Sequence, residues 1–459
     1  MSQKTRPTSL SATLKAALSK PLGGGGDVRM TAALTGRHPA EIVQAMSEMT
    51  NPEALAVFNW LDNSRAAEVL DELDSETVRF LTDNAPPGRM AELLDHLPMD
   101  DAAEVISEAG PEQAESLLAD LSKRAPEDAA EVRRLLAYPE YSAGRLMTDK
   151  FAWVAPSTNA TEVLAYLRAN ADSLETVNDI YVLDPTRKLL GVSPIRRVLT
   201  ADPGQPIREF MTPDPISIAP EKEQQEAAIL ISRYDMLTLP VTTENGAMLG
   251  IVTIDDSIDV LVEEFDEDYL RSVGSDAEEL ERKSPAQIAL LRMPWLMATL
   301  FIELFAGVII HAFDATLTKF ILLASFMPII SAISGNTGLQ SAAIIIRGLS
   351  SGQVQMENWR HAVTRQMATT VILGAACAST LGVIGGIWDH HWSFGFVVFL
   401  GMFASVNIAG VVGTVVPLLS KRAGFDPALT AGPFETAFQD VVGISIFLSL
   451  AATLLRWLH

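Results

Sequence analysis

The chain has 459 residues, of which 48% are hydrophobic and 20% charged, and this content excludes a disordered chain and an ordinary single soluble domain. Its formal net charge of −23 lies entirely in the first 292 residues, because residues 293–459 hold seven acidic and seven basic side chains. This separation argues against a nucleic-acid partner and favours a cationic one. A single cysteine, Cys377, provides neither an intrachain disulfide nor a cysteine metal cluster.

The N-terminal segment, residues 1–35, is predicted to be a flexible tail. Residues 1–30 are polar and weakly basic and have no apolar stretch typical of a signal peptide. Gly23 to Gly26 have the composition of a flexible linker.

Residues 36–138 contain a repeat of 24 residues, whose four copies place apolar pairs at Ala45, Val69, Leu93 and Leu117. Prolines and glycines between the copies break the helices, so the pattern predicts short helices stacked in an α-solenoid. The acids of this segment lie mostly at outward positions of the repeat, and each is interpreted as a solvated surface group: Asp71, Glu72, Asp74, Asp95, Asp100, Asp101 and Glu104.

A second repeat, with an offset of 64 residues, follows in residues 139–256, where Met147-Thr148 recurs as Met211-Thr212. Each copy has a helical stretch followed by β-rich stretches, and the layout resembles a tandem pair of cystathionine-β-synthase-type (CBS) domains, at residues 139–200 and 201–256. In that family a Thr/Ser-x-x-Asp after the last strand often holds a ribose. Thr253 and Asp256 fit this motif, and the resemblance therefore implies an adenine nucleotide such as ATP there, whereas the first copy lacks the acid.

Residues 257–292 are predicted to form a connecting helix, because Ile258, Leu261, Val262 and Phe265 recur at helical spacing. Six acids crowd another face and repel one another unless cations neutralise them. This favours a cation-sensing helix over a solvated connector. The six acids are Asp259, Glu263, Glu264, Asp266, Glu267 and Asp268.

The remaining residues, 293–459, are predicted to form a transmembrane domain of five helices. The apolar segments 293–313, 320–346, 366–388, 392–420 and 428–455 are each long enough to cross the hydrocarbon core. Basic residues concentrate before span one, between spans two and three, and between spans four and five. The positive-inside rule then places the N-terminal half in the cytoplasm and the C-terminus outside a multi-pass protein of the cell (inner) membrane.

Two spans carry the functional signals. Pro328 and the run Ser334 to Gly338 are expected to break the second span, and broken backbone at that depth usually lines a cavity. Asp440 lies near the centre of the fifth span, where a carboxylate costs roughly 2.5 to 3.5 kcal/mol on insertion scales. We therefore expect Asp440 to face water or a partner and to contact a permeating cation.

Read in order, these segments resemble the bacterial MgtE magnesium channel family over residues 36–459. The specific motifs are Met327-Pro328 with Gly335-Asn336-Thr337-Gly338-Leu339-Gln340, and Gly432-Pro433-Phe434 preceding Asp440-Val441-Val442-Gly443. The resemblance implies a homodimer in a lipid bilayer that conducts Mg²⁺ through a pore formed by spans two and five, with one Asp440 from each subunit holding a hydrated ion. The other pore or motif residues are Gly335, Asn336, Gly338, Gln340, Gly432, Pro433, Glu435 and Gln439.

The resemblance also implies that cytoplasmic Mg²⁺ closes the pore by binding between the solenoid, the second CBS domain and the connecting helix. Glu435 departs from the small or apolar residue expected at its position, which leaves the choice of ion open. The candidate regulatory ligands are Asp100, Glu104, Asp235, Asp256, Asp259, Glu264, Glu267, Asp268 and Asp426.

Several alternatives stay open. The same architecture serves a channel for Co²⁺ or Mn²⁺, an exchanger coupled to Na⁺ or protons, or a membrane ion sensor that transports nothing. An intramembrane hydrolase would require paired aspartates or a serine with a base at membrane depth, and Asp440 is the single mid-span aspartate of the sequence, so the chain is not interpreted as an enzyme.

Overall fold

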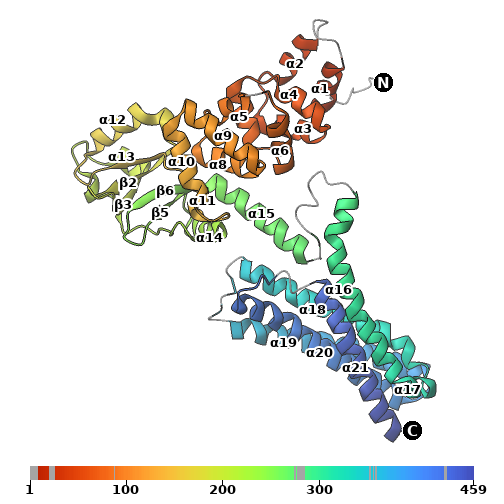
Figure 1. The fold of residues 1–459 in the computed structure, drawn as a ribbon. Coiled ribbons are helices and arrows are strands. Elements are labelled where there is room, and N and C mark those ends of the chain that lie inside the picture. The colour runs from red at the N-terminus through yellow and green to blue at the C-terminus, as the bar shows by residue number, and fades with distance from the viewer. Residues whose placement is uncertain are drawn as a thin grey trace, which may run out of the picture. The chain divides into compact units, whose positions relative to one another are not determined.

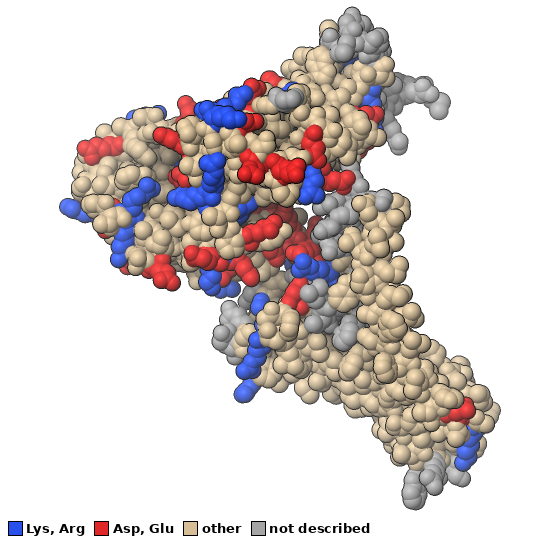
Figure 2. All heavy atoms as spheres, viewed as in Figure 1, with Lys and Arg blue, Asp and Glu red and all other residues tan. Residues whose placement is uncertain are grey.

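The computed structural model describes residues 9–19, 26–86, 88–272, 275, 285–350, 353–354, 356, 359–427 and 432–458. Its contacts divide the chain into two units, Met1–Leu261 and Val262–His459. Figure 1 shows helices and short strands in the first unit and long helices in the second. Figure 2 shows Asp and Glu gathered over the first unit, whereas the long helices present few charged side chains on that face.

The solenoid consists of short helices joined by tight turns: α3 (Pro39–Ser47), α4 (Asn51–Phe58), α5 (Asn63–Asp71), α6 (Ser75–Asn84), α7 (Arg89–Leu94), α8 (Met99–Glu108), α9 (Pro111–Arg124) and α10 (Pro126–Leu136). The repeated apolar positions are buried in the first three copies, as at Met46, Leu70 and Leu94, and half-buried in the fourth, which confirms the helical repeat. Helix starts follow the sequence signals: Asp62 and Asp74 accept hydrogen bonds from backbone N–H groups of the first turns of α5 and α6.

The expected flexible tail is wrong for the described residues that precede the solenoid. These residues form α1 (Leu10–Leu18) and α2 (Gly26–Leu34). Leu14, Met30 and Leu34 are buried in the same core as the solenoid helices, because apolar residues recur at helical spacing even within a polar segment. Lys15 Nζ also donates a hydrogen bond of 2.6 Å to the carbonyl of Glu48. The proposed linker at Gly23 to Gly25 lies outside the described residues.

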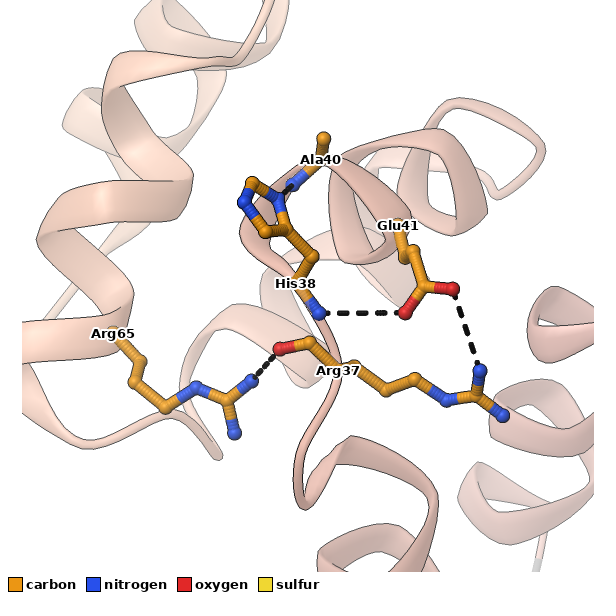
Figure 3. Close-up of polar contacts among 5 residues, drawn as sticks. All are labelled: Arg37, His38, Ala40, Glu41 and Arg65. Carbon is orange, nitrogen blue, oxygen red and sulfur yellow. Dashed lines mark hydrogen bonds and ion pairs between the residues drawn. The ribbon is translucent and has the colours of Figure 1, made fainter.

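A polar clasp joins α2 to the solenoid (Figure 3). Arg65 of α5 donates through Nη1 to the carbonyl of Leu34 at 2.8 Å and through Nη2 to the carbonyl of Arg37. His38 caps α3 by accepting from the Ala40 N–H at 3.3 Å, and the carboxylate of Glu41 accepts from the His38 N–H. The clasp gives side-chain donors to the carbonyl of Leu34 at the end of α2 and to the carbonyl of Arg37 in the turn that follows.

Two β-sheets form the CBS pair. The first has the order β1 (Phe151–Val154), β2 (Thr176–Leu183), β3 (Leu189–Pro194) and β4 (Thr212–Pro213), with β1 and β2 parallel and the other pairs antiparallel. The second pairs β5 (Thr238–Thr242) with β6 (Met248–Thr253). Helices α12 (Ala160–Asn170) and α14 (Gln224–Tyr234) start 64 residues apart, which is the sequence offset. The smaller helices are α11 (Ala143–Leu146), α13 (Ile195–Thr200), η1 (Ala171–Ser173) and η2 (Ile207–Glu209).

The two CBS copies exchange their first segments. Thr212 of the second copy pairs with Val192 of the first, and Thr148 of the first pairs with Ile251 of the second. A Cβ at Gly250 would lie 2.6 Å from the carbonyl oxygen of Thr148, so a residue without a side chain is needed for this approach. The exchange therefore ties both copies into one body.

The acidic connecting helix is α15 (Ile254–Ser272), which begins earlier and ends earlier than the predicted range 257–292. Ser275 is not helical, and residues 285–292 belong to the first spanning helix. The apolar positions Ile258, Leu261, Val262 and Phe265 are exposed in the single chain, and Val260 is buried instead.

Within the described residues, five helices are long and apolar enough to cross a membrane: α16 (Pro285–Ala312), α18 (Leu323–Ser350), α19 (Trp359–Trp388), α20 (Trp392–Ala423) and α21 (Pro433–Leu458). The short helix α17 (Asp314–Lys319) joins α16 to α18. Helix α20 packs against α18, α19 and α21, whereas α16 packs along α21. Much of the apolar surface of α16 is exposed in the single chain, as at Leu296, Phe301 and Phe305.

The predicted break in the second span is wrong, because α18 runs through Pro328 and Ser334 to Gly338 without interruption. Hydroxyl groups along the helix donate to carbonyls one turn earlier: Ser334 Oγ to Ile330 at 2.8 Å and Thr337 Oγ1 to Ile333 at 2.8 Å. Neighbouring helices and these hydroxyls support small residues in a spanning helix that would weaken an isolated one.

Candidate functional site

The side chain of Asp440 lies where three spanning helices meet. Ser331 Oγ of α18 donates a hydrogen bond to Oδ1 of Asp440 on α21. Glu303 of α16 also interacts with Asp440 through its side chain. Ser331 is buried and Asp440 is half-buried, so the carboxylate combines a fixed partner with access from outside the chain. Sequence reasoning missed Ser331 and Glu303 as neighbours, since that contact depends on helix packing.

Glu435 and Gln439 lie on the α18-facing side of α21. They are 2% and 1% exposed, so neither belongs to an open surface of the single chain. A Cβ at Gly338 would collide with the Glu435 carboxylate, and a Cβ at Gly413 of α20 would collide with the Gly338 carbonyl. Close packing of α18, α20 and α21 thus depends on Gly338, whose small size accommodates the Glu435 side chain.

The amide side chains of the α18 motif point away from the bundle core. Asn336 and Gln340 are one turn apart and both exposed, whereas Gly335 and Gly338 are buried. At the start of α21, Gly432 has a φ of +77°, and Pro433 is the first helical residue. The side chain of Pro433 lies outside the described part of the chain.

In the first unit, carboxylates from three helices form an acidic cluster, which we define as Asp71 of α5, Asp100 and Asp101 of α8, and Asp255, Asp256 and Asp259 of α15, with Glu104 and Glu175 at its margin. Asp101 shares a hydrogen bond with Asp71. Asp100 interacts with Asp256, and one of its oxygens is buried without a hydrogen-bond partner among the described residues. The solenoid and α15 therefore bring together acids that are more than 150 residues apart in the sequence.

The electrostatics of the acidic cluster strongly favour protonation or a bound cation. Burial, with the nearby Asp256 charge, raises the pKa of Asp100 to about 8. Burial and the charges of Asp100 and Asp71 raise the pKa of Asp101 to about 10. Burial raises the pKa of Asp256 to about 6, although a hydrogen bond from Thr253 opposes the shift. The interpretation of Asp100 and Asp101 as solvated surface acids is therefore wrong, because helix packing half-buries both.

The acidic cluster fits a hydrated ion better than a dehydrated one. Among the described residues no three His, Cys, Asp or Glu side chains are close enough to hold a metal directly. Mg²⁺ keeps several of its waters and binds through a few carboxylates, so a spaced set of oxygens suits it. The Asp100, Glu104, Asp256 and Asp259 carboxylates would hold such an ion through water.

The other predicted regulatory acids lie elsewhere. Asp235 ends α14 in a left-handed conformation and is exposed. Glu264 is half-buried on α15, and the side chain of Asp268 lies outside the described residues. Glu267 and Asp426 both form ion pairs with Arg271.

A cavity of about 290 Å³ opens between the two CBS copies and the start of α15. Leu237, Ile254 and Ile258 form its apolar part, and each is partly exposed. Thr253 also lines the cavity and donates a hydrogen bond to Asp256, which is not among the lining residues. The remaining lining residues are Glu175, Thr176, Asn178, Thr238 and Asp255.

Parts of the chain match three described families. Residues 327–450 match MgtE, described as a divalent cation transporter, residues 37–141 match the MgtE intracellular N domain, and residues 207–263 match the CBS domain. Together with the five membrane-length helices, these matches define a multi-pass membrane transport protein with a CBS pair.

Relatives that match about three quarters of the chain make the assignment specific. A magnesium transporter MgtE of Bacillus subtilis (strain 168) is 33% identical over 73% of this chain and 74% of its own length. The Thermus thermophilus MgtE is 35% identical over 72% of this chain and 74% of its own length. The chain therefore belongs to the MgtE family of magnesium transporters. The crystal structure of the cytosolic domain of an Mg²⁺ channel MgtE in complex with ATP is 33% identical, with a TM-score of 0.51, and covers 55% of this chain and 99% of that chain.

Proposed function

We propose that the protein is a Mg²⁺-selective channel for magnesium uptake, that its N-terminal half is cytoplasmic, and that cytoplasmic Mg²⁺ closes it. The observation that carries this proposal is the Asp440 carboxylate, held by Ser331 and adjoined by Glu303 within spanning helices. A carboxylate at this depth is costly unless water, a partner or an ion compensates it. Mg²⁺ uptake into vesicles that contain only the purified protein tests the proposal.

We propose further that the pore forms between two copies of the chain. Asn336 and Gln340 are exposed on a spanning helix, and amide groups that faced lipid would leave their hydrogen-bonding capacity unmet. A second copy and a water-filled path between the copies would meet that need. Two Asp440 carboxylates would then act on an ion that keeps its first water shell.

Inward movement of Mg²⁺ would need no ATPase. A membrane potential of 100 mV contributes about 4.6 kcal/mol for a divalent ion, twice the value for one charge. An uncontrolled pore would overload the cell, so we assign the feedback to the acidic cluster. A bound cation would cancel repulsion between α8 and α15 and favour the compact closed state, to the extent that it binds the two states differently.

The pH dependence of Mg²⁺ binding tests this role of the acidic cluster. An aspartate of unfolded chain has a pKa of about 3.9, so Asp256, Asp100 and Asp101 bind protons more tightly when folded. Stability without Mg²⁺ should therefore fall as the pH rises from about 4 through these raised values. Because Mg²⁺ must displace those protons, its midpoint concentration should fall by up to about tenfold per pH unit for each proton released.

Thermal unfolding of the full chain, followed by tryptophan fluorescence with and without Mg²⁺, measures this effect. We expect Mg²⁺ to raise the Tm more at pH 8 than at pH 6. An equal increase at both pH values would show that the cluster does not bind the ion.

For the CBS cavity we propose an adenine nucleotide, with the base on the apolar rim at Leu237 and Ile258 and the ribose at Thr253, whose hydroxyl is hydrogen-bonded to Asp256. The ATP complex of the related cytosolic domain supports this proposal. Thr253→Val removes the hydroxyl but keeps the shape of the side chain, and we expect it to weaken ATP binding at least about tenfold, or about 1.4 kcal/mol. Calorimetric titration with ATP and with GTP measures the affinity and the base preference. Equal ATP affinity of the parent protein and the Thr253→Val variant would contradict a nucleotide site at Thr253.

A further inference from the structure

Arg271 lies between two acids that the sequence predicts to be cation ligands. Its Nη1 is 2.9 Å from Oδ2 of Asp426, in the segment after α20, and its Nη2 forms an ion pair with Glu267, one turn earlier on α15. The three side chains are 36%, 25% and 37% exposed, respectively, so the contact is neither fully buried nor fully solvated. A guanidinium therefore occupies the space between a helix carboxylate and a loop carboxylate.

Local structure fixes the position of the loop carboxylate. Gly424 ends α20 with a φ of +80°, and the Phe425 N–H donates to the carbonyl of Ser420 at 2.9 Å. This left-handed helix end turns the chain so that Asp426 meets Arg271. Backbone bonds therefore define the turn that precedes Asp426.

A second contact joins the same half of α15 to the membrane domain. The guanidinium of Arg347, in the last turn of α18, lies 5.1 Å from the ring centroid of Phe265. A guanidinium in this position is attracted to the face of the aromatic ring by a cation–π interaction. Phe265 and Arg271 are almost two turns apart on α15, so the helix is held at two points.

We propose that Arg271 is a positioning residue that takes the place of a divalent cation between Glu267 and Asp426. Its fixed charge holds the C-terminal half of α15 against the membrane domain without metal, and it thereby lowers the Mg²⁺ concentration needed for closure. Arg271 keeps its charge at all physiological pH values and bonds two carboxylates in its planar fork. This inference rests on the proposed function only for its link to closure.

Hydrogen exchange of the backbone amides of residues 262–272, measured on the full chain in nanodiscs, tests the proposal. Arg271→Gln removes the charge and leaves the two carboxylates to repel each other. We expect this variant to exchange about fivefold faster than the parent protein when Mg²⁺ is absent, a change of the size expected for partly exposed ion pairs. Added Mg²⁺ at millimolar concentration should restore the protection, because the ion then bridges the carboxylates.

Three further variants define the controls. Arg271→Lys keeps the positive charge and should stay within about twofold of the parent protein, since lysine lacks only the planar fork. Arg233→Gln on α14 makes the same chemical change at an exposed position and should leave the segment unaffected. Asp426→Asn combined with Arg271→Gln should remove the rescue by Mg²⁺.

Two results would overturn the proposal. Unchanged exchange of Arg271→Gln without Mg²⁺ would mean that the contact does not hold the helix. Faster exchange that Mg²⁺ does not correct would mean that the carboxylate pair is not a cation site. Neither readout depends on transport, so a failure of Mg²⁺ flux in the parent protein would refute the proposed function and leave the exchange result intact.

Discussion

Asp440→Asn is expected to abolish Mg²⁺ uptake while the protein keeps its fold. Asparagine has nearly the same shape and still accepts the hydrogen bond from Ser331, but it removes the negative charge that would attract a hydrated divalent ion. We expect uptake into vesicles to fall at least about 100-fold, equivalent to about 2.7 kcal/mol. A fluorescent Mg²⁺ indicator inside the vesicles measures the initial rate.

Asp314→Asn is the matched control, because Asp314 is exposed at the start of the short helix α17 and the substitution is chemically identical. Its uptake should equal that of the parent protein. Size-exclusion elution and Tm should be unchanged in both variants. Near-normal uptake by the folded Asp440→Asn variant would contradict the assignment of Asp440 to the pore.

Neutralising three acids of α15 together, Asp256→Asn, Asp259→Asn and Glu264→Gln, is expected to abolish closure by cytoplasmic Mg²⁺. The three side chains supply negative charge along one helix, and Asp256 belongs to the acidic cluster that would bind the ion. Without that charge Mg²⁺ binds the closed and open states with similar affinity. Its binding then no longer shifts the equilibrium between the two states. Protease cleavage of the N-terminal half, with and without Mg²⁺, measures the loss.

In the parent protein, Mg²⁺ should slow cleavage, whereas the triple variant should be cleaved at one rate under both conditions. Glu112→Gln, Glu115→Gln and Asp120→Asn on α9 form a control of equal charge change on another helix. This control should keep the protection by Mg²⁺. Protection of the triple variant equal to that of the parent protein would place the sensor elsewhere.

Periodic features of the sequence predicted the fold well. The 24-residue repeat, the 64-residue repeat and the five apolar segments each depend on local spacing, and each appears in the structure as the expected class of element. The wrong expectations concern segments in which overall composition is a weak predictor of secondary structure. Residues 1–30 look polar as a whole, yet Leu14 and Ala17 on one face of residues 10–18 are enough to bury that helix.

The second span shows why residue type alone misleads. Proline, serine and glycine predict a break, but Ser334 and Thr337 bond back to their own helix and Gly413 packs against Gly338. These compensations come from neighbouring turns and helices. The helix propensities of the individual residues do not predict these compensating contacts.

Some candidate site residues were predictable from the sequence, whereas others depend on how the helices pack. Asp440 was identifiable because a charge in an apolar span stands out. Its neighbours Ser331 and Glu303 were not, since they come from two other helices more than 100 residues away. The raised pKa values of Asp100 and Asp101 likewise follow from packing of α8 near α15, and no sequence spacing predicts them.

The central claim is that Asp440 supports passive, selective passage of Mg²⁺. The most direct test measures Mg²⁺ entry into vesicles that contain the purified protein, under an inside-negative membrane potential and with no Na⁺ or proton gradient. The account predicts rapid entry that Co²⁺ and Mn²⁺ do not match and that Asp440→Asn abolishes. Entry that requires an opposing Na⁺ or proton gradient, or no entry in either protein, would contradict it.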